Sequence, residues 1–281
     1  MIRQTHRIRE LRRLLKVTQN QVSATKAFAA LFFSFLMGLA AGLIGVGGGE
    51  FRIPILLYVI GLPIIAAVAV NLFVGLLTVI VSFLIRFQLG LLDAHAINVA
   101  LTMSVGSIFG SYLGAALTGR VKEDSLKKGL AVLLVIIGLK IGLEPFVHTP
   151  PLFEFTLGFV EETFLAALVG VVIGVISGLL GVAGGEFRIP ALIYVFGFDI
   201  KVAGTASLLV SIPTVATGFV KHRQMGHINK GATVIAVIMS IGSVVGAFIG
   251  ASQAAVVEKD VLKVLLGVIL ILATVRMVSK P

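Results

Sequence analysis

The chain has 281 residues, of which 58% are hydrophobic and only 13% are charged, and its mean hydropathy is +1.09. A soluble domain carries roughly twice this share of charge, so the composition excludes a soluble two-domain enzyme and predicts an all-α polytopic membrane protein. The chain lacks cysteine, which excludes a thiol-ligated metal, and we expect neither a metal nor another cofactor.

Residues 1–26 form a basic segment, with seven Lys and Arg residues against a single acid, Glu10. This pattern is typical of a cytoplasmic amphipathic segment that lies on anionic lipid, and we favour that interpretation over a nucleic-acid contact. We expect no cleaved signal peptide, because the apolar segment that follows recurs at 164–181, where nothing could be cleaved.

The rest of the chain is a tandem repeat. The run Gly42 to Pro54 recurs as Gly178 to Pro190, and this offset of 136 residues holds without a gap to the end of the chain. Fifteen of the 20 residues from 42 to 61 are identical in the second copy. We therefore predict transmembrane repeats at 27–143 and 163–281 and an extracytoplasmic linker at 144–162.

Each repeat contains apolar stretches of two lengths. The long stretches suffice for a membrane-spanning helix of about 20 residues, whereas the short ones cover about half a bilayer. We expect each half-helix to carry its proline, Pro54 or Pro190, in the first turn and to end at Gly61 or Gly197. The predicted long spans are 27–45, 63–86, 94–118, 127–144, 162–181, 200–220, 231–252 and 261–278, and the half-helices are 51–60 and 187–196.

The loop charges indicate how these segments cross the membrane. If each first span and its half-helix form a hairpin that returns to the cytoplasm, the basic loops 120–128 and 221–230 lie inside and the acidic linker lies outside. Arg86 and Lys259 are the exceptions. The positive-inside rule therefore predicts two inverted repeats, each a re-entrant helical hairpin plus three transmembrane helices. We expect a multi-pass protein of the inner membrane with cytoplasmic N- and C-termini.

Each half-helix follows a glycine cluster and carries an arginine, Arg52 or Arg188. Clustered glycines expose N–H groups, helix N-termini attract anions, and inverted repeats bring two such tips together near the midplane. The sequence thus predicts a buried, positive site for a small oxyanion. A dinucleotide fingerprint is a poor alternative, because that motif needs a preceding strand. The predicted substrate-binding residues are the two arginines with Gly47, Gly48, Gly49, Gly184 and Gly185.

Other polar residues near the tips leave alternatives open. Glu50 and Glu186 either cap the half-helix or pair with an arginine, or they carry a proton that couples to transport. Asn71 and its repeat partner Ser207, with Thr205 nearby, are predicted to complete the hydrogen bonds of the substrate, although hydrogen bonds between helices explain them nearly as well.

Two further patterns have simpler interpretations. Gly106, Gly110 and Gly114 recur in the second repeat with small-xxx-small spacing, which predicts close helix packing. We interpret His222 as a loop histidine rather than a proton relay. No residue pair has metal-ligand spacing and no Ser/His/Asp arrangement stands out, so we expect no enzyme.

The paired Gly-Gly-Glu-Phe-Arg-Ile-Pro segments resemble those of the TauE/SafE sulfite exporter family of membrane permeases, over essentially the whole chain after residue 26. The family motif maps to Gly45, Gly47, Gly48, Gly49 and Pro54, and to Gly181, Gly184, Gly185 and Pro190. Its usual form has an apolar residue after the glycines, so Glu50, Phe51 and Arg52 suggest a subgroup with its own substrate or coupling.

The resemblance implies a secondary transporter, an exporter of a small sulfur-containing anion such as sulfite or an organosulfonate, with alternating access between inverted repeats and ion-gradient coupling. Two alternatives stay open: an anion channel, and a structural or assembly protein that transports nothing. The oligomeric state, a homodimer included, is also open at this point.

Overall fold

The computed structural model describes residues 24–117, 123–147, 158–180, 182–225 and 230–278. These residues form helices joined by short turns, and the part of the chain described contains no strand. Most of the basic segment 1–26, the central part of the linker, the start of the loop at 120–128 and the extreme C-terminus lie outside the described residues, so the expectations for them stay predictions.

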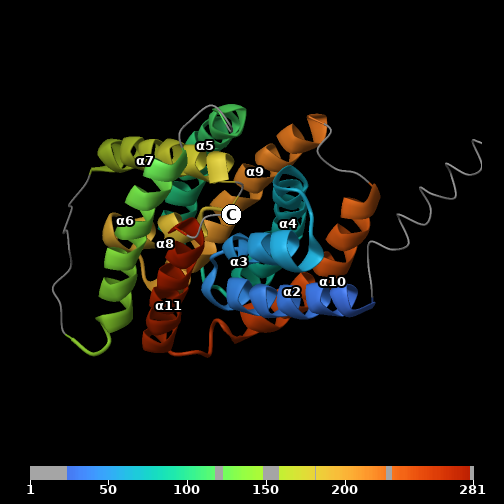
Figure 1. Ribbon diagram of the computed structural model, residues 1–281. Helices are drawn as coiled ribbons and strands as arrows, with labels where there is room; N and C mark the ends of the chain where they lie inside the picture. The colour runs from blue at the N-terminus through green and yellow to red at the C-terminus, as the bar shows by residue number, and fades with distance from the viewer. Residues whose placement is uncertain (1–23, 118–122, 148–157, 181, 226–229, 279–281) are drawn as a thin grey trace, which may run out of the picture.

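The helices follow the repeat of the sequence (Figure 1). A shift of 136 residues carries α4 onto α9 and α5 onto α10 with the same boundaries, and the other pairs agree to within a few residues. The elements are α2 (Ala24–Ile44), α3 (Gly49–Pro54), η1 (Ile55–Ile60), α4 (Ile64–Gln88), α5 (Ala94–Leu117), α6 (Glu123–Leu143), α7 (Phe159–Leu180), α8 (Gly185–Tyr194), α9 (Ile200–Gln224), α10 (Lys230–Gln253) and α11 (Lys259–Val278).

Six helices of the described residues are long and apolar enough to cross a membrane: α2, α4, α5, α7, α9 and α10. The multi-pass character predicted from composition is therefore confirmed. The two half-helices are also present, as α3 with η1 and as α8.

The two repeats are interlocked rather than side by side. The first helix of each repeat packs against the other repeat, α2 on α10 and α7 on α5, while α6 packs on α11 and α4 on α9 (Figure 1). When the two repeats are exchanged, the α2–α10 contact becomes the α7–α5 contact, and the α4–α9 and α6–α11 contacts each map onto themselves. A two-fold axis between the repeats would produce this pattern. One buried apolar cluster contains residues of α2, η1, α4 and α10. A larger cluster contains residues of the helices from α5 through α9 and of α11.

The glycines with small-xxx-small spacing explain the interlocking. A Cβ atom added to Gly106, Gly110 or Gly114 of α5 would collide with backbone carbonyl oxygens of α7, and Gly242, Gly246 and Gly250 of α10 meet α2 in the same way. The packing interpretation is therefore confirmed. Side chains at these positions would separate two helices that now lie backbone to backbone.

The expected place of the prolines is wrong. Pro54 and Pro190 lie in the second turn of α3 and α8, because each helix already begins at Gly49 or Gly185. The preceding residues Gly48 and Gly184 adopt the left-handed conformation, with φ of 69° and 75°, which lets the chain turn directly into the helix. In the first repeat the backbone after Pro54 continues as a π-helical stretch, where the proline cannot supply its N–H.

Candidate functional site

The glycine tips of the two repeats meet in the interior. A Cβ atom on Gly185 would collide with the carbonyl oxygen of Val46, and one on Gly47 would come within 2.8 Å of Cβ of Ala183. Val46, Ala183 and both glycines are buried. The loops before α3 and α8 therefore touch each other directly.

Arg52 is fully buried and folds back onto its own repeat. Its Nη2 donates to the carbonyl of Gly47 and to Thr78 Oγ1 at 3.4 Å, and its Nη1 donates to Asn71 Oδ1 at 3.3 Å. Asn71 also lies against Gly49, at the start of α3. The guanidinium thus ties the glycine tip to α4.

Arg188 has the same arrangement in the second repeat. Its Nη2 donates to the carbonyl of Ala183 at 3.2 Å, the position that matches Gly47. Its Nη1 donates to Ser211 Oγ at 2.7 Å and to the backbone oxygen of Ser207 at 3.2 Å. Ser207, the repeat partner of Asn71, therefore contributes a carbonyl rather than its hydroxyl.

Glu50 and Glu186 are 3% and 2% exposed, and they lie close enough to interact directly across the boundary between the repeats. Among the described residues neither forms an ion pair with an arginine, and both oxygens of Glu50 and Oε2 of Glu186 have no hydrogen-bond donor. Gly48 and Gly184 hold the N-cap positions, and no side chain caps either helix there.

Several buried polar atoms at the tips lack partners within the described part of the chain. Besides the carboxylates, they include Nε of Arg52, Nε of Arg188 and the hydroxyl of Ser207. Leaving a buried donor or acceptor unsatisfied costs about 1–3 kcal/mol, and more when the group is charged. The tips therefore keep polar groups that do not stabilise the fold, as expected of a ligand or ion pathway.

The structure places Thr205 with a residue that the sequence did not assign to a site. Nε of Arg86 donates to Thr205 Oγ1 at 3.0 Å, and Arg86 is fully buried. Its Nη1 donates to the carbonyls of Gly42 and Leu43, and its Nη2 donates to that of Lys201. Arg86 thus fastens the end of α2 to the first turn of α9.

One feature of the sequence pointed to the unusual position of Arg86. Arg86 was an exception to the expected charge asymmetry, and its burial explains why it need not follow a rule that concerns loop residues. The other exception, Lys259, forms an ion pair with Asp199 at 2.8 Å. His222, which matches Arg86 in the second repeat, is 4% exposed, so its interpretation as a solvated loop residue is wrong.

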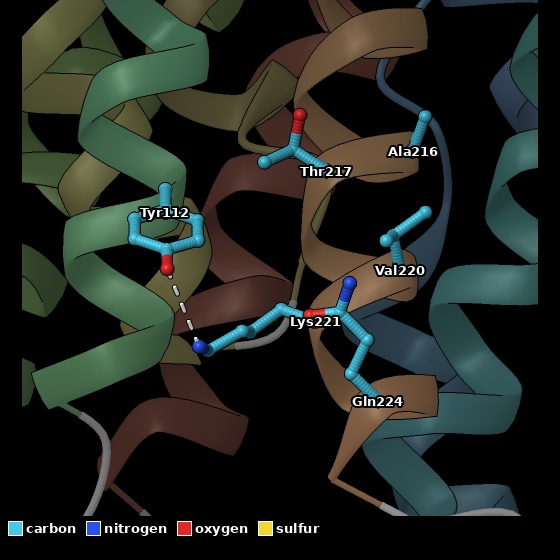
Figure 2. A pocket seen from close by; sticks show the side chains of 6 residues that line it. All are labelled: Tyr112, Ala216, Thr217, Val220, Lys221 and Gln224. Carbon is cyan, nitrogen blue, oxygen red and sulfur yellow. Dashed lines mark hydrogen bonds between the residues drawn. The ribbon is translucent and has the colours of Figure 1, made fainter.

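A pocket of about 290 Å³ opens between α5 and α9 (Figure 2). Lys221 reaches across it, with its Nζ 3.5 Å from the hydroxyl of Tyr112 and 4.8 Å from the centre of that ring. The Lys221–Tyr112 pair has no counterpart between α4 and α10, because Ile85 and Phe248 occupy the matching positions. The pocket is lined by Tyr112, Ala216, Thr217, Val220, Lys221 and Gln224.

Within the described ranges no group of three or more His, Cys, Asp or Glu residues could hold a metal ion.

Comparisons with known proteins agree on the kind of protein. The chain is 24% identical over 249 residues to the probable membrane transporter protein YunE of Bacillus subtilis, covering 80% of this chain and 87% of that one. It is 26% identical over 231 residues to the probable membrane transporter protein YdhB of the same organism, covering 82% and 91%.

A probable membrane transporter protein of Haemophilus influenzae is 30% identical over 146 residues, which cover 47% of this chain and 53% of that one. No solved structure matches. The profile of the family described as sulfite exporter TauE/SafE matches residues 3–141 and 165–281, nearly the whole chain. The interlocked apolar helices, the glycine tips and this match together place the chain in the TauE/SafE family of membrane transporters.

Proposed function

We propose that the protein is a secondary transporter, an exporter of a small sulfur-containing anion such as sulfite or an organosulfonate. The family description and the names of the relatives support transport. The observation that carries the proposal is the meeting of two glycine tips whose buried charged groups keep atoms without hydrogen-bond partners among the described residues. Such groups inside a membrane protein mark the path of a ligand or an ion.

The arginines supply the chemistry for an oxyanion. In each guanidinium the Nη atoms bind protein oxygens, whereas Nε–H has no acceptor within the described part of the chain. A sulfite or sulfonate oxygen would provide that acceptor, with the tight geometry of a charge-assisted hydrogen bond. Because the tips touch, an anion can enter between them only when they move apart.

Inverted repeats explain how that movement opens the site alternately to the two sides. The exchange of helix pairs under the 136-residue shift supports a two-fold relation, and the loop charges support opposite orientations. The moving bodies are not the sequence repeats themselves. Glycine contacts join α10 to α2 and α5 to α7, so one body comprises α2, α3, η1, α4 and α10, and the other α5, α7, α8 and α9. The tips and the α4–α9 contact lie between them.

The pocket between α5 and α9 is a candidate mouth of the pathway. Lys221 lies 14 residues beyond Ser207 on the same helix, about 20 Å away along its axis. The basic last turn of α9, with Lys221, His222 and Arg223, agrees with a cytoplasmic position. An anion drawn from the cytoplasm would meet this lysine before the tips. The same charge pattern supports an inner-membrane protein with both termini inside.

Flux into proteoliposomes tests the proposal. We expect one or more of sulfite, thiosulfate, sulfate, sulfoacetate and taurine to exchange saturably, and faster when the same anion is present on the far side. An anion channel would give a flux that does not saturate and shows no such stimulation, and an assembly protein would give none.

Conservative variants test the site itself. Arg52→Lys and Arg188→Lys keep the charge but remove Nε–H, so each should slow exchange at low anion concentration by about 10- to 100-fold, the value of one hydrogen bond to a charged group. Arg223→Lys, in the exposed last turn of α9, is the matched control. If both site variants exchanged anions at the wild-type rate, Arg52 and Arg188 would not bind the anion.

A further inference from the structure

Glu50 and Glu186 lie on the two glycine tips, which touch where the repeats meet, and their carboxyl groups are close enough to interact electrostatically. Each is the second residue of its short helix, each occupies the same place in the repeat, and both are almost completely buried. They interact directly, and the charged groups that act on Glu186 are Glu50 and Arg188. From the sequence we expected each glutamate to act separately, as a helix cap, as the partner of an arginine or as a proton carrier.

Two ionised carboxylates cannot satisfy each other, because both offer only acceptors. Neither oxygen of Glu50 has a donor among the described residues, and Oε2 of Glu186 has none either. The Nη atoms of Arg52, which could have been donors to the carboxylates, instead bind Gly47, Asn71 and Thr78. Those of Arg188 bind Ala183, Ser207 and Ser211. A single proton would remove the repulsion between like charges and form an O–H···O bond between the two groups.

Charges on the neighbouring helices do not replace that proton. The charged groups nearest the pair are Arg52 and Arg188, on the same two tips. On the helices packed around α3 and α8, seven basic residues have partners of their own at other places in the fold: Lys26, Arg86, Lys140, Lys201, Lys221, Lys259 and Lys263.

We propose that Glu50 and Glu186 share one exchangeable proton and that this proton moves together with the transported anion. The inference rests on the proposed function. Two arginines and two ionised glutamates are neutral together, so an anion would enter with no net attraction. With one proton on the pair, the tips carry one net positive charge, and one negative charge on the anion balances it. Proton and anion therefore bind cooperatively and cross in the same direction.

The coupling of proton to anion determines the direction of net anion transport. A proton that moves with a monoanion leaves the cycle electrically neutral, so net flux follows the sum of the anion and proton gradients. Export then occurs when the anion is more concentrated inside by a factor larger than the opposing proton gradient. An exporter that exchanges its anion for protons would require the opposite sign of proton movement.

Proteoliposomes that contain a pH dye test the pair. Under an inward anion gradient, wild-type protein should acidify the lumen by about one proton per monoanion, and an acidic outside should accelerate uptake. The double variant Glu50→Gln, Glu186→Gln cannot exchange the proton, so it should lose both effects but retain exchange of anion for anion, which needs no net proton movement. Glu161→Gln, an exposed residue at the start of α7, should behave as wild type.

The outcomes separate this inference from the proposed function. If wild-type protein exchanges anions but anion uptake moves no protons, or moves them outward, the shared proton is wrong and the transporter proposal stands. If it exchanges no anion, the transporter proposal itself fails. Should the double variant not fold, proton uptake by wild-type protein in detergent decides the matter: adding the anion at weak buffering should raise the pH, and an unchanged or falling pH would overturn the inference.

Discussion

Replacing Arg86 with methionine should strongly destabilise the protein. The side chain of Arg86 makes four hydrogen bonds, to Thr205 Oγ1 at 3.0 Å, to the carbonyls of Gly42 and Leu43 at 3.1 and 2.7 Å, and to that of Lys201 at 2.7 Å. Methionine has a similar length but no donor, so Arg86→Met leaves buried acceptors unsatisfied at the junction of the two repeats.

The expected loss of unfolding free energy is about 3–5 kcal/mol. Each hydrogen bond to a charged group contributes about 1.5–3 kcal/mol, but the sum overestimates the loss, because neighbouring groups relax and water enters. The loss corresponds to a fall in melting temperature on the order of 10 °C. Thermal unfolding in detergent, followed by the loss of helical circular dichroism, measures it.

A double-mutant cycle makes the reasoning specific to this contact. Thr205→Ala alone should cost about 2 kcal/mol, because it removes the hydrogen bond that Thr205 Oγ1 accepts from Arg86 and the one that it donates to the carbonyl of Lys201. In the Arg86→Met background the same change should cost clearly less, since only the hydrogen bond to the carbonyl of Lys201 remains to be lost. Arg223→Met, in the exposed last turn of α9, serves as the control. If Arg86→Met melted within about 2 °C of wild type, the guanidinium would not fasten the repeats together.

Three other predictions follow from contacts outside the tips. Gly246→Leu should separate α10 from α2 and lower the melting temperature, whereas Gly129→Leu, with open space around it, should not; equal melting temperatures would contradict the close packing. Asp199→Ala should cost about 1 kcal/mol in chemical unfolding, because the Asp199 carboxylate caps α9, and Asp199→Asn should recover most of it. Lys221→Gln should raise the KM for anion efflux without lowering its maximal rate, and an unchanged KM would exclude the pocket as the cytoplasmic mouth.

The positions of the helices could be predicted from the sequence because the fold is repeated and apolar. The spans expected at 63–86 and 200–220 correspond to α4 and α9, and the half-helices appear where the glycine clusters interrupt the apolar sequence. The contact of Gly106 and its neighbours with another helix was also predictable, because small residues at this spacing leave a helix surface that only another backbone can fill.

The partners across the repeats could not be predicted. Sequence spacing says which residues share a helix face, but the pairing of Glu50 with Glu186 depends on how two distant tips approach each other. The same limit applies to Arg86, whose partners lie at the ends of α2 and α9. The glutamates looked like natural partners for the arginines, yet the guanidinium groups bind the glycine-loop carbonyls instead, because those oxygens lie within reach of the same tip. The prolines were placed one turn too early, since left-handed glycines start each helix sooner.

The central claim is that the two glycine tips separate during transport, and a reversible cross-link tests it most directly. The chain contains no cysteine, so Val46→Cys with Ala183→Cys introduces the only thiols, one on each tip. Oxidation should abolish anion exchange in proteoliposomes, and reduction should restore it, while each single cysteine variant should exchange anions under both conditions. Full exchange by protein shown to be cross-linked would contradict the account.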